Sequence, residues 1–230
     1  MSLYNEMKKY IFYILFSLLI GVFSCQKKIT PQSYLALGDN YTVGESVLQN
    51  QSWPFQLTKV LSEKNIKISS PRIIAKTGWN SSELKIGINN SSLDFPYDWV
   101  SLLIGVNDQY QGRNIEEFKE QFEVLLAEAI SFSGNKKERV FAVSIPDWAV
   151  MPFAKELNRE QISKEIDDFN QVIYEVCSFE NIHFIDITSI SRSVKDNPSF
   201  IAKDSLHPSG TQYSRWIKQM IPFFLNRIDD

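Results

Sequence analysis

The sequence predicts an α/β fold, a three-layer α/β/α sandwich built around a five-stranded parallel sheet. Five short segments are apolar nearly throughout, as strands covered on both faces are. Helical spacing of apolar residues recurs between these segments. The 230 residues, of which 43% are hydrophobic and 22% charged, suit one domain with a sizeable core, and no internal repeat or second domain boundary interrupts the alternation.

The predicted strands are runs of apolar, often β-branched or aromatic residues that are bounded by polar or turn residues. In chain order they are SYLALGD (33–39), ISSPRIIAK (68–76), DWVSLLIGVND (98–108), RVFAVSIPD (139–147) and IHFIDIT (182–188). In sheets of this type, ligands bind beyond the carboxyl ends of the strands. We therefore expect the functional residues at those ends.

The predicted helices have apolar residues three or four positions apart. They are SWPFQLTKVLSEKN (52–65), NIEEFKEQFEVLLAEAISF (114–132), NREQISKEIDDFNQVIYEVCSF (158–179) and SGTQYSRWIKQMIPFFLNRI (209–228). Each lies between or after predicted strands, so these helices should cover the two faces of the sheet. Cys177 sits among the apolar residues of the third helix and is expected to be a buried packing residue.

The N-terminal segment reads as a targeting signal. Lys8 and Lys9 precede an apolar run, residues 10–23, that is too short to cross a bilayer comfortably but suits the core of a secretory signal. The run ends in VFSC, which resembles the lipobox of bacterial lipoproteins and implies that Cys25 is acylated. The alternative is a plain signal peptide or anchor with an incidental cysteine.

This interpretation divides the chain into a lipoprotein-type signal peptide (1–24), a tether (25–32) and one domain (33–230). It implies a lipid-anchored protein of the bacterial cell envelope, on the periplasmic or outer surface. If Cys25 is lipidated, Cys177 has no partner and no intramolecular disulfide can form. The formal charge of −3 and the lack of a basic run argue against nucleic-acid binding.

Polar motifs stand at the ends of the predicted strands and in one late loop. They are GDN (38–40), TGWN (77–80), GVND (105–108), IPDW (145–148) and DSLHPSG (204–210). In this order the motifs resemble the SGNH (GDSL) family of ester hydrolases, over essentially the whole chain after the signal. The matching positions are Gly38, Asp39, Gly78, Gly105, Asn107, Asp108, Asp204 and His207. The family's nucleophilic serine is absent, because position 40 is an asparagine.

His207 and Asp204 have the spacing of a general base and the carboxylate that orients it. The other histidine, His183, begins a predicted strand at the opposite end of the sheet and is expected to be structural. The alternative interpretation is that His207 is a surface histidine in a loop without a catalytic role. The other motifs make the catalytic interpretation the stronger one.

Acyl transfer also needs donors for the developing oxyanion, and the candidates are Gly78, Asn107 and the backbone N–H of Asn40. Gly78 could equally be a turn glycine, and Asn107 with Asp108 could cap the helix before RNIEEF. Asp39 and Asp108 are assigned supporting roles. They could instead suggest a magnesium site, but no further ligand cluster accompanies them, so no metal is expected.

Asn40 leaves three interpretations open, because an amide nitrogen is not nucleophilic. The chain could be a binding protein that has lost turnover, an active esterase altered at one position, or a hydrolase in which His207 activates water directly. Serine and asparagine codons differ by one base, so the second is easily reached. Thr42 and Ser46 follow the motif, but the turn into a helix should aim them elsewhere.

Four aromatic residues flank the expected mouth of the site and could line an apolar acyl pocket: Trp79, Tyr110, Trp148 and Phe153. Core packing is the alternative for each. The family resemblance implies hydrolysis of carboxylic esters, including lipid, thioester or acetylated sugar substrates, without cofactor or metal. We expect the protein to be a monomer. The rival hypothesis is a ligand-binding pseudoenzyme that uses the same cleft.

Overall fold

The computed structural model describes residues 7, 30–94 and 96–227. The expected signal peptide and Cys25 lie outside these residues, apart from Met7. The chain divides into two compact units, Met1–Thr30 and Pro31–Asp230, and the fold below is that of the second. None of the helices in the described ranges is long and apolar enough to span a bilayer.

The sheet has five parallel strands in the order β2-β1-β3-β4-β5, which confirms the predicted fold class. The strands are β1 (Tyr34–Gly38), β2 (Arg72–Ala75), β3 (Trp99–Leu103), β4 (Val140–Val143) and β5 (His183–Ile185). This order is flavodoxin-like, and its direction reverses between β1 and β3. Gly38, at the end of β1, pairs with Leu103, at the end of β3, so the residues after these strands emerge side by side.

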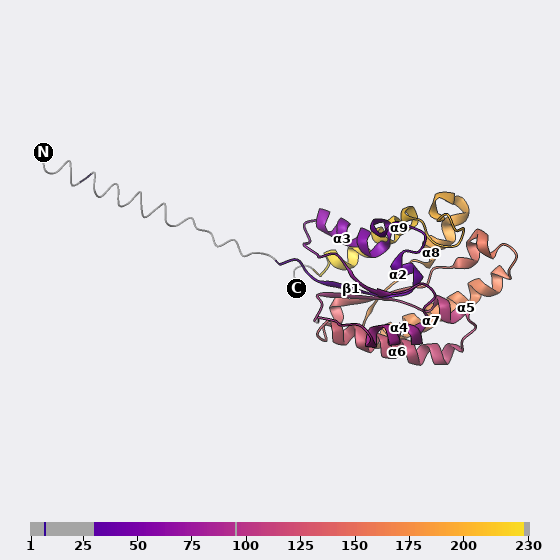
Figure 1. The fold of residues 1–230 in the computed structure, drawn as a ribbon, viewed down its shortest axis with the longest axis horizontal. Helices are drawn as coiled ribbons and strands as arrows, with labels where there is room; N and C mark the ends of the chain where they lie inside the picture. Colours follow the sequence, from indigo (N-terminus) through magenta and orange to yellow (C-terminus); the bar gives the residue numbers. More distant parts are fainter. Residues whose placement is uncertain (1–6, 8–29, 95, 228–230) are drawn as a thin grey trace. The chain divides into compact units, whose positions relative to one another are not determined.

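Helices cover both faces of the sheet (Figure 1). The α-helices are α2 (Asn40–Val43), α3 (Trp53–Glu63), α4 (Ser81–Asn89), α5 (Val106–Tyr110), α6 (Ile115–Phe132), α7 (Arg159–Glu180), α8 (Thr188–Arg192) and α9 (Gly210–Leu225). Short 3-10 turns η1 to η6 span Gln49–Gln51, Lys137–Arg139, Trp148–Val150, Pro152–Ala154, Ser193–Asp196 and Pro198–Phe200. In Figure 1, α3 and α9 lie above the strands, and α4, α6 and α7 lie below them.

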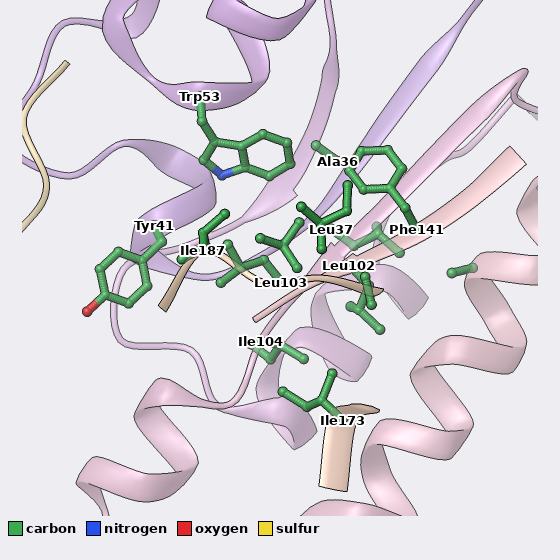
Figure 2. Close-up of a cluster of buried hydrophobic side chains, with 14 of the residues drawn as sticks. Ala36, Leu37, Tyr41, Trp53, Leu102, Leu103, Ile104, Phe141, Ile173 and Ile187 are labelled. Carbon is green, nitrogen blue, oxygen red and sulfur yellow. The ribbon is translucent and has the colours of Figure 1, made fainter. Parts of the chain in front are cut away.

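The core lies on both sides of the central strands. Every residue of β1 and β3 is buried, whereas the edge strands β2 and β5 are partly exposed. Figure 2 shows Trp53 of α3 and Ile173 of α7 approaching strand residues such as Leu103 from opposite sides. The two strands that lead into the GDN and GVND motifs are therefore, like β4, fixed by burial along their whole length.

Several boundaries differ from the sequence-based expectation. The expected strand 98–108 ends at Leu103, because Gly105 takes a φ of 128° and α5 starts at Val106. Helix α4 was not expected, although Asn80 and Glu83 form a reciprocal capping box at its start. Gln32, assigned to the tether, exchanges backbone hydrogen bonds with the segment before β2.

Two residues expected to be structural are placed accordingly. Cys177 is a buried free thiol on α7, and burial raises its pKa to about 12. His183 begins β5, at the sheet edge opposite the strand ends, and stacks on Phe223 with 4.7 Å between ring centroids. Neither side chain is available to the chemistry at the carboxyl ends of the strands.

Candidate active site

Asn40 is fixed directly beyond β1 by its two neighbours in the GDN motif. Asp39 Oδ1 accepts a 3.0 Å hydrogen bond from the Tyr41 N–H and caps the short helix α2. A side chain at Gly38 would lie 2.2 Å from Thr42 Oγ1 and 2.4 Å from the Leu103 carbonyl oxygen. Only glycine lets the strand turn so tightly into α2, and the turn packs the Thr42 hydroxyl against Gly38.

Asp39 itself is fully buried. Its Oδ2 atom has no hydrogen-bond partner among the described residues. Burial, with a smaller contribution from the charge of Asp108, raises the Asp39 pKa to about 8, despite the hydrogen bond from Tyr41. Asp39 therefore caps α2 as a carboxyl that is mostly protonated at neutral pH. Its contribution to stability depends on pH.

The side chains of Asn40, His207 and Asp204 form a chain of hydrogen bonds. Asn40 Nδ2 lies 2.9 Å from His207 Nε2, and His207 Nδ1 lies 2.5 Å from Asp204 Oδ2. The carboxylate can only accept, so the ring proton sits on Nδ1 and Nε2 accepts from the Asn40 amide. The Tyr41 ring meets the His207 ring edge-on, at 5.9 Å between centroids.

Asp204 is held in its charged form. Partial burial alone would raise its pKa, but four hydrogen bonds outweigh burial and hold the pKa well below its usual value. Ser46 Oγ donates to Oδ2 at 2.5 Å, the backbone N–H groups of Leu206 and His207 donate to Oδ1 at 3.0 Å, and the His207 ring supplies the fourth. This role of Ser46 was not predicted from the sequence, because it depends on a left-handed backbone with φ 64° at this residue.

Asn107 completes the cluster from α5. Its Nδ2 donates to Asn40 Oδ1 and to the Trp79 backbone carbonyl, at 2.9 Å in each case. The helix α5 starts at once after Gly105, where a Cβ atom would lie 2.8 Å from the Phe118 ring. Glycine at this position therefore lets β3 turn sharply and brings Asn107 beside Asn40.

Gly78 and Asp108 border the cluster. Gly78 lies in the turn after β2 with a φ of 84°, as a turn glycine would, and it also lines the pocket at the site. Asp108 accepts hydrogen bonds from the Ser81 hydroxyl at 2.6 Å and the Ser81 N–H at 2.9 Å, which ties the start of α4 to α5. Burial raises the Asp108 pKa.

Two alternatives for these residues can be compared with the geometry. Asn114 accepts from the first N–H groups of α6, so Asn107 and Asp108 do not cap that helix. Asp39 and Asp108 are occupied with the backbone of α2 and with Ser81, respectively. No group of three His, Cys, Asp or Glu side chains suited to a metal ion occurs in the described part of the chain.

A pocket of about 220 Å³ opens beside Asn40 and His207. Its lining residues are Asn40, Tyr41, Thr77, Gly78, Val106, Asn107, Tyr110, Trp148, Phe153, Leu206 and His207. Three of the four aromatic residues expected at the mouth are among them. The fourth, Trp79, does not line this pocket. Its ring packs over Gly87 of α4 and lines a different depression, which matches the packing alternative, and only its backbone carbonyl reaches the site.

Trp148 forms the buried wall of this pocket. Its Nε1 donates to Gln109 Oε1 at 2.8 Å, and Gln109 Nε2 donates in turn to Glu165 at 2.7 Å. Tyr110 and Phe153 contact the Trp148 ring from the outer rim and are 59% and 49% exposed. The pocket thus combines one polar corner with an aromatic wall that is fixed at its inner end.

Four other lining residues and Gln109 were not anticipated. Val106 and Leu206 adjoin Asn107 and His207 in the sequence, so the motifs themselves could have pointed to them. Tyr41 and Thr77 likewise adjoin Asn40 and Gly78. Gln109 has no such signal, because its role depends on how Trp148 packs against α5.

Comparisons with known proteins concern the sequence family and the fold of the chain. The family model of the GDSL-like lipase/acylhydrolase family matches residues 36–215. The fold is similar to a lipase/acylhydrolase from Enterococcus faecalis at 18% identity, with a TM-score of 0.68 over 85% of this chain and 96% of that one. No curated protein matches the sequence significantly.

Two further solved structures share the fold at 16% identity. One is the psychrotrophic esterase EstA from a Pseudoalteromonas species, with a TM-score of 0.63 over 86% of this chain and all of that one. The other is the acetylxylan esterase Axe2 from Geobacillus stearothermophilus, with a TM-score of 0.64 over 85% of this chain and 95% of that one. At this level of identity, the likeness concerns the fold.

Proposed function

The chain belongs to the GDSL-like lipase/acylhydrolase family, and from this premise we propose that the cleft beyond β1 and β3 is a carboxylic-ester hydrolase site that lacks its nucleophile. The observation that carries the proposal is the 2.9 Å contact between Asn40 Nδ2 and His207 Nε2. A nucleophile activated by this base would have to occupy the same place.

The residues around Asn40 supply the other parts of acyl-transfer chemistry. His207, held by Asp204, is the general base for a hydroxyl at position 40 and later the acid for the leaving alcohol. The Asn107 amide, with the backbone N–H groups of Gly78 and residue 40, is the set of donors for the oxyanion. Asp39 and Asp108 act indirectly, because they hold in place the helices α2 and α5 that carry Asn40 and Asn107.

With asparagine at position 40, the acyl-enzyme route is closed. Loss of the triad serine in a studied protease costs about 10⁶-fold in turnover, which corresponds to about 8 kcal/mol. We therefore propose that this chain hydrolyses esters very slowly or not at all. Direct activation of water by His207 is disfavoured, because the Asn40 amide already occupies the lone pair of Nε2.

The pocket supports a neutral ester with a short apolar or ring-shaped acyl part as the ligand. None of its lining residues is Asp, Glu, Lys or Arg, and its larger wall is formed by Trp148, Tyr110 and Phe153. Lipid, thioester and acetylated sugar esters remain within the proposal, because aromatic rings pack against alkyl chains and sugar rings alike. We further propose a monomer without cofactor that binds no nucleic acid and reaches the membrane through lipidated Cys25.

A second candidate function is a ligand-binding protein without turnover. One observation favours it: the Asn40 amide donates to His207 Nε2 and accepts from Asn107 Nδ2. These two polar groups therefore have hydrogen-bond partners although the site has no serine hydroxyl. A site that has lost its nucleophile but keeps its buried polar groups hydrogen-bonded does not destabilise the fold.

The variant Asn40→Ser tests the proposal. It should hydrolyse short p-nitrophenyl esters at least about 10³-fold faster than the unaltered protein, because the hydroxyl then lies beside His207. Asn40→Ala is the matched control and should stay inactive, as should Asn40→Ser with His207→Ala. If the folded serine variant is inert across acyl lengths, the esterase proposal is wrong and the binding protein is favoured.

A further inference from the structure

The side chain of Asn40 is held at both ends of its amide group. Oδ1 accepts from Asn107 Nδ2, and Nδ2 donates to His207 Nε2, at 2.9 Å in each case. These bonds continue through Asp204 to the Ser46 hydroxyl. The amide is therefore fixed in position and orientation, and the Asn40 residue is only 6% exposed.

The two ends of the Asn40 amide occupy the places of the nucleophile and of the ester carbonyl oxygen, if the site is the ester site proposed above. The nitrogen has the place of the nucleophile, beside the base. The carbonyl oxygen lies against the Asn107 amide, which is the proposed oxyanion donor. A carboxamide is planar and has an acceptor oxygen like that of an ester or a carboxylic acid.

Asn107 has no donor to spare for a ligand in this arrangement. Its Nδ2 carries two hydrogens, and both are used, one by Asn40 Oδ1 and one by the Trp79 carbonyl. The bond to Trp79 joins α5 to the loop before α4, whereas the bond to Asn40 ends on a side chain beside the pocket. Only removal of the Asn40 carbonyl would release a hydrogen of Asn107 toward the pocket.

From this geometry we propose that the Asn40 side chain is an internal ligand that fills the polar corner of the pocket and excludes carbonyl and carboxylate ligands from the amide donor of Asn107. The inference rests on the proposed function, since it uses that assignment of the donors. It states that the unaltered chain offers ligands the aromatic wall of Trp148 and withholds its polar corner.

Butyrate is a suitable probe, because it combines a carboxylate with a short apolar tail. Its dissociation constant should be measured by NMR titration at pH 6 for the unaltered protein, for Asn40→Ala and for Asn40→Ser. Both variants should bind butyrate at least about tenfold more tightly than the unaltered protein, which corresponds to 1.4 kcal/mol. Far-UV circular dichroism checks that each variant is folded.

Two matched variants separate the hydrogen bonds from the volume of the side chain. Asn40→Leu fills a similar space without accepting from Asn107, so it should bind butyrate as weakly as the unaltered protein. Adding Asn107→Ala to Asn40→Ala should abolish the gain. In the unaltered protein, both Asn40 side-chain amide protons should give resolved NMR signals that butyrate does not shift.

The proposal is overturned if the unaltered protein binds butyrate as tightly as Asn40→Ala, if neither binds it, or if the gain persists without Asn107. These outcomes are distinct from failure of the proposed function. An inert Asn40→Ser protein that binds butyrate tightly would sink the esterase proposal and leave the internal ligand intact. An active Asn40→Ser protein that binds butyrate no more tightly than the unaltered protein would support the esterase proposal and overturn the internal ligand.

Discussion

The amide nitrogen of Asn40 lies 2.9 Å from Nε2 of His207, although the two residues are 167 positions apart in the chain. The contact depends on two separate segments of the fold. The tight turn after β1 positions Asn40, and the loop before α9 positions His207, whose ring is held by Asp204. A base poised beside a side chain that cannot act as a nucleophile is the feature that the predictions below test.

Asp204→Asn should remove most of the activity of the Asn40→Ser protein. The asparagine can no longer fix the proton on His207 Nδ1, and the corresponding change costs about 10⁴-fold in kcat in a serine protease. Ser46→Ala removes only one neutral donor from Asp204, so its loss should stay below about a hundredfold. Steady-state kinetics of the two variants in the serine background give the comparison, and equal losses would contradict the assigned roles.

Phe153→Ala should weaken the binding of longer acyl esters to the Asn40→Ser protein. The ring borders the Trp148 wall and is half exposed, so its removal takes away contact area without opening the core. We expect KM for hexanoate esters to rise about three- to tenfold, with little change for acetate esters. A uniform change across acyl lengths, measured with p-nitrophenyl esters, would show that the wall does not contact the acyl group.

The sequence predicted the layers of the fold well, because buried parallel strands are apolar at nearly every position. It also indicated which residues would gather, since parallel strands end at one edge. The directions in which individual side chains point could not be predicted as well from the sequence. Trp79 follows a strand end as Trp148 does, yet it packs over Gly87 of α4, a helix that was not anticipated.

The role of Ser46 shows the same limit. Its hydroxyl reaches Asp204 across 158 positions only because the backbone after α2 turns through a left-handed conformation. A positive φ is uncommon at serine, and local sequence does not specify which distant carboxylate lies opposite the hydroxyl. Contacts of this kind are decided by tertiary packing.

Asp39→Asn should flatten the pH dependence of stability. Burial raises the folded-state pKa of Asp39 to about 8, against an ordinary value of 3.8 for an aspartate. Between these values the folded protein holds a proton that the unfolded chain has lost, so the free energy of unfolding should fall as pH rises. The slope is at most about 1.4 kcal/mol per pH unit for one group.

Urea unfolding of the domain at pH 5, 6, 7 and 8 measures this effect. Asp108 contributes with the same sign, because its pKa is also raised, and its part should remain in the Asp39→Asn protein. An equally steep fall in both proteins would show that Asp39 is ionised throughout.

Cys25→Ala should release the protein from membranes or block its processing, when the chain is expressed in a bacterium with its own N-terminal segment. The expectation rests on the short apolar run that ends in VFSC. Fractionation of cells and the mass of the purified protein are the measurements. Unchanged partition and mass in the variant would contradict acylation of Cys25.

The central claim is that the site is complete except for its nucleophile, and covalent labelling of the Asn40→Ser protein tests it most directly. An alkyl fluorophosphonate should add one phosphonyl group per chain at Ser in position 40, as seen by intact mass and peptide mapping. The unaltered protein and Asn40→Ser with His207→Ala should stay unlabelled, or react at least about 10³-fold more slowly. Equal labelling with and without His207, or no labelling of the folded serine variant, would contradict the account.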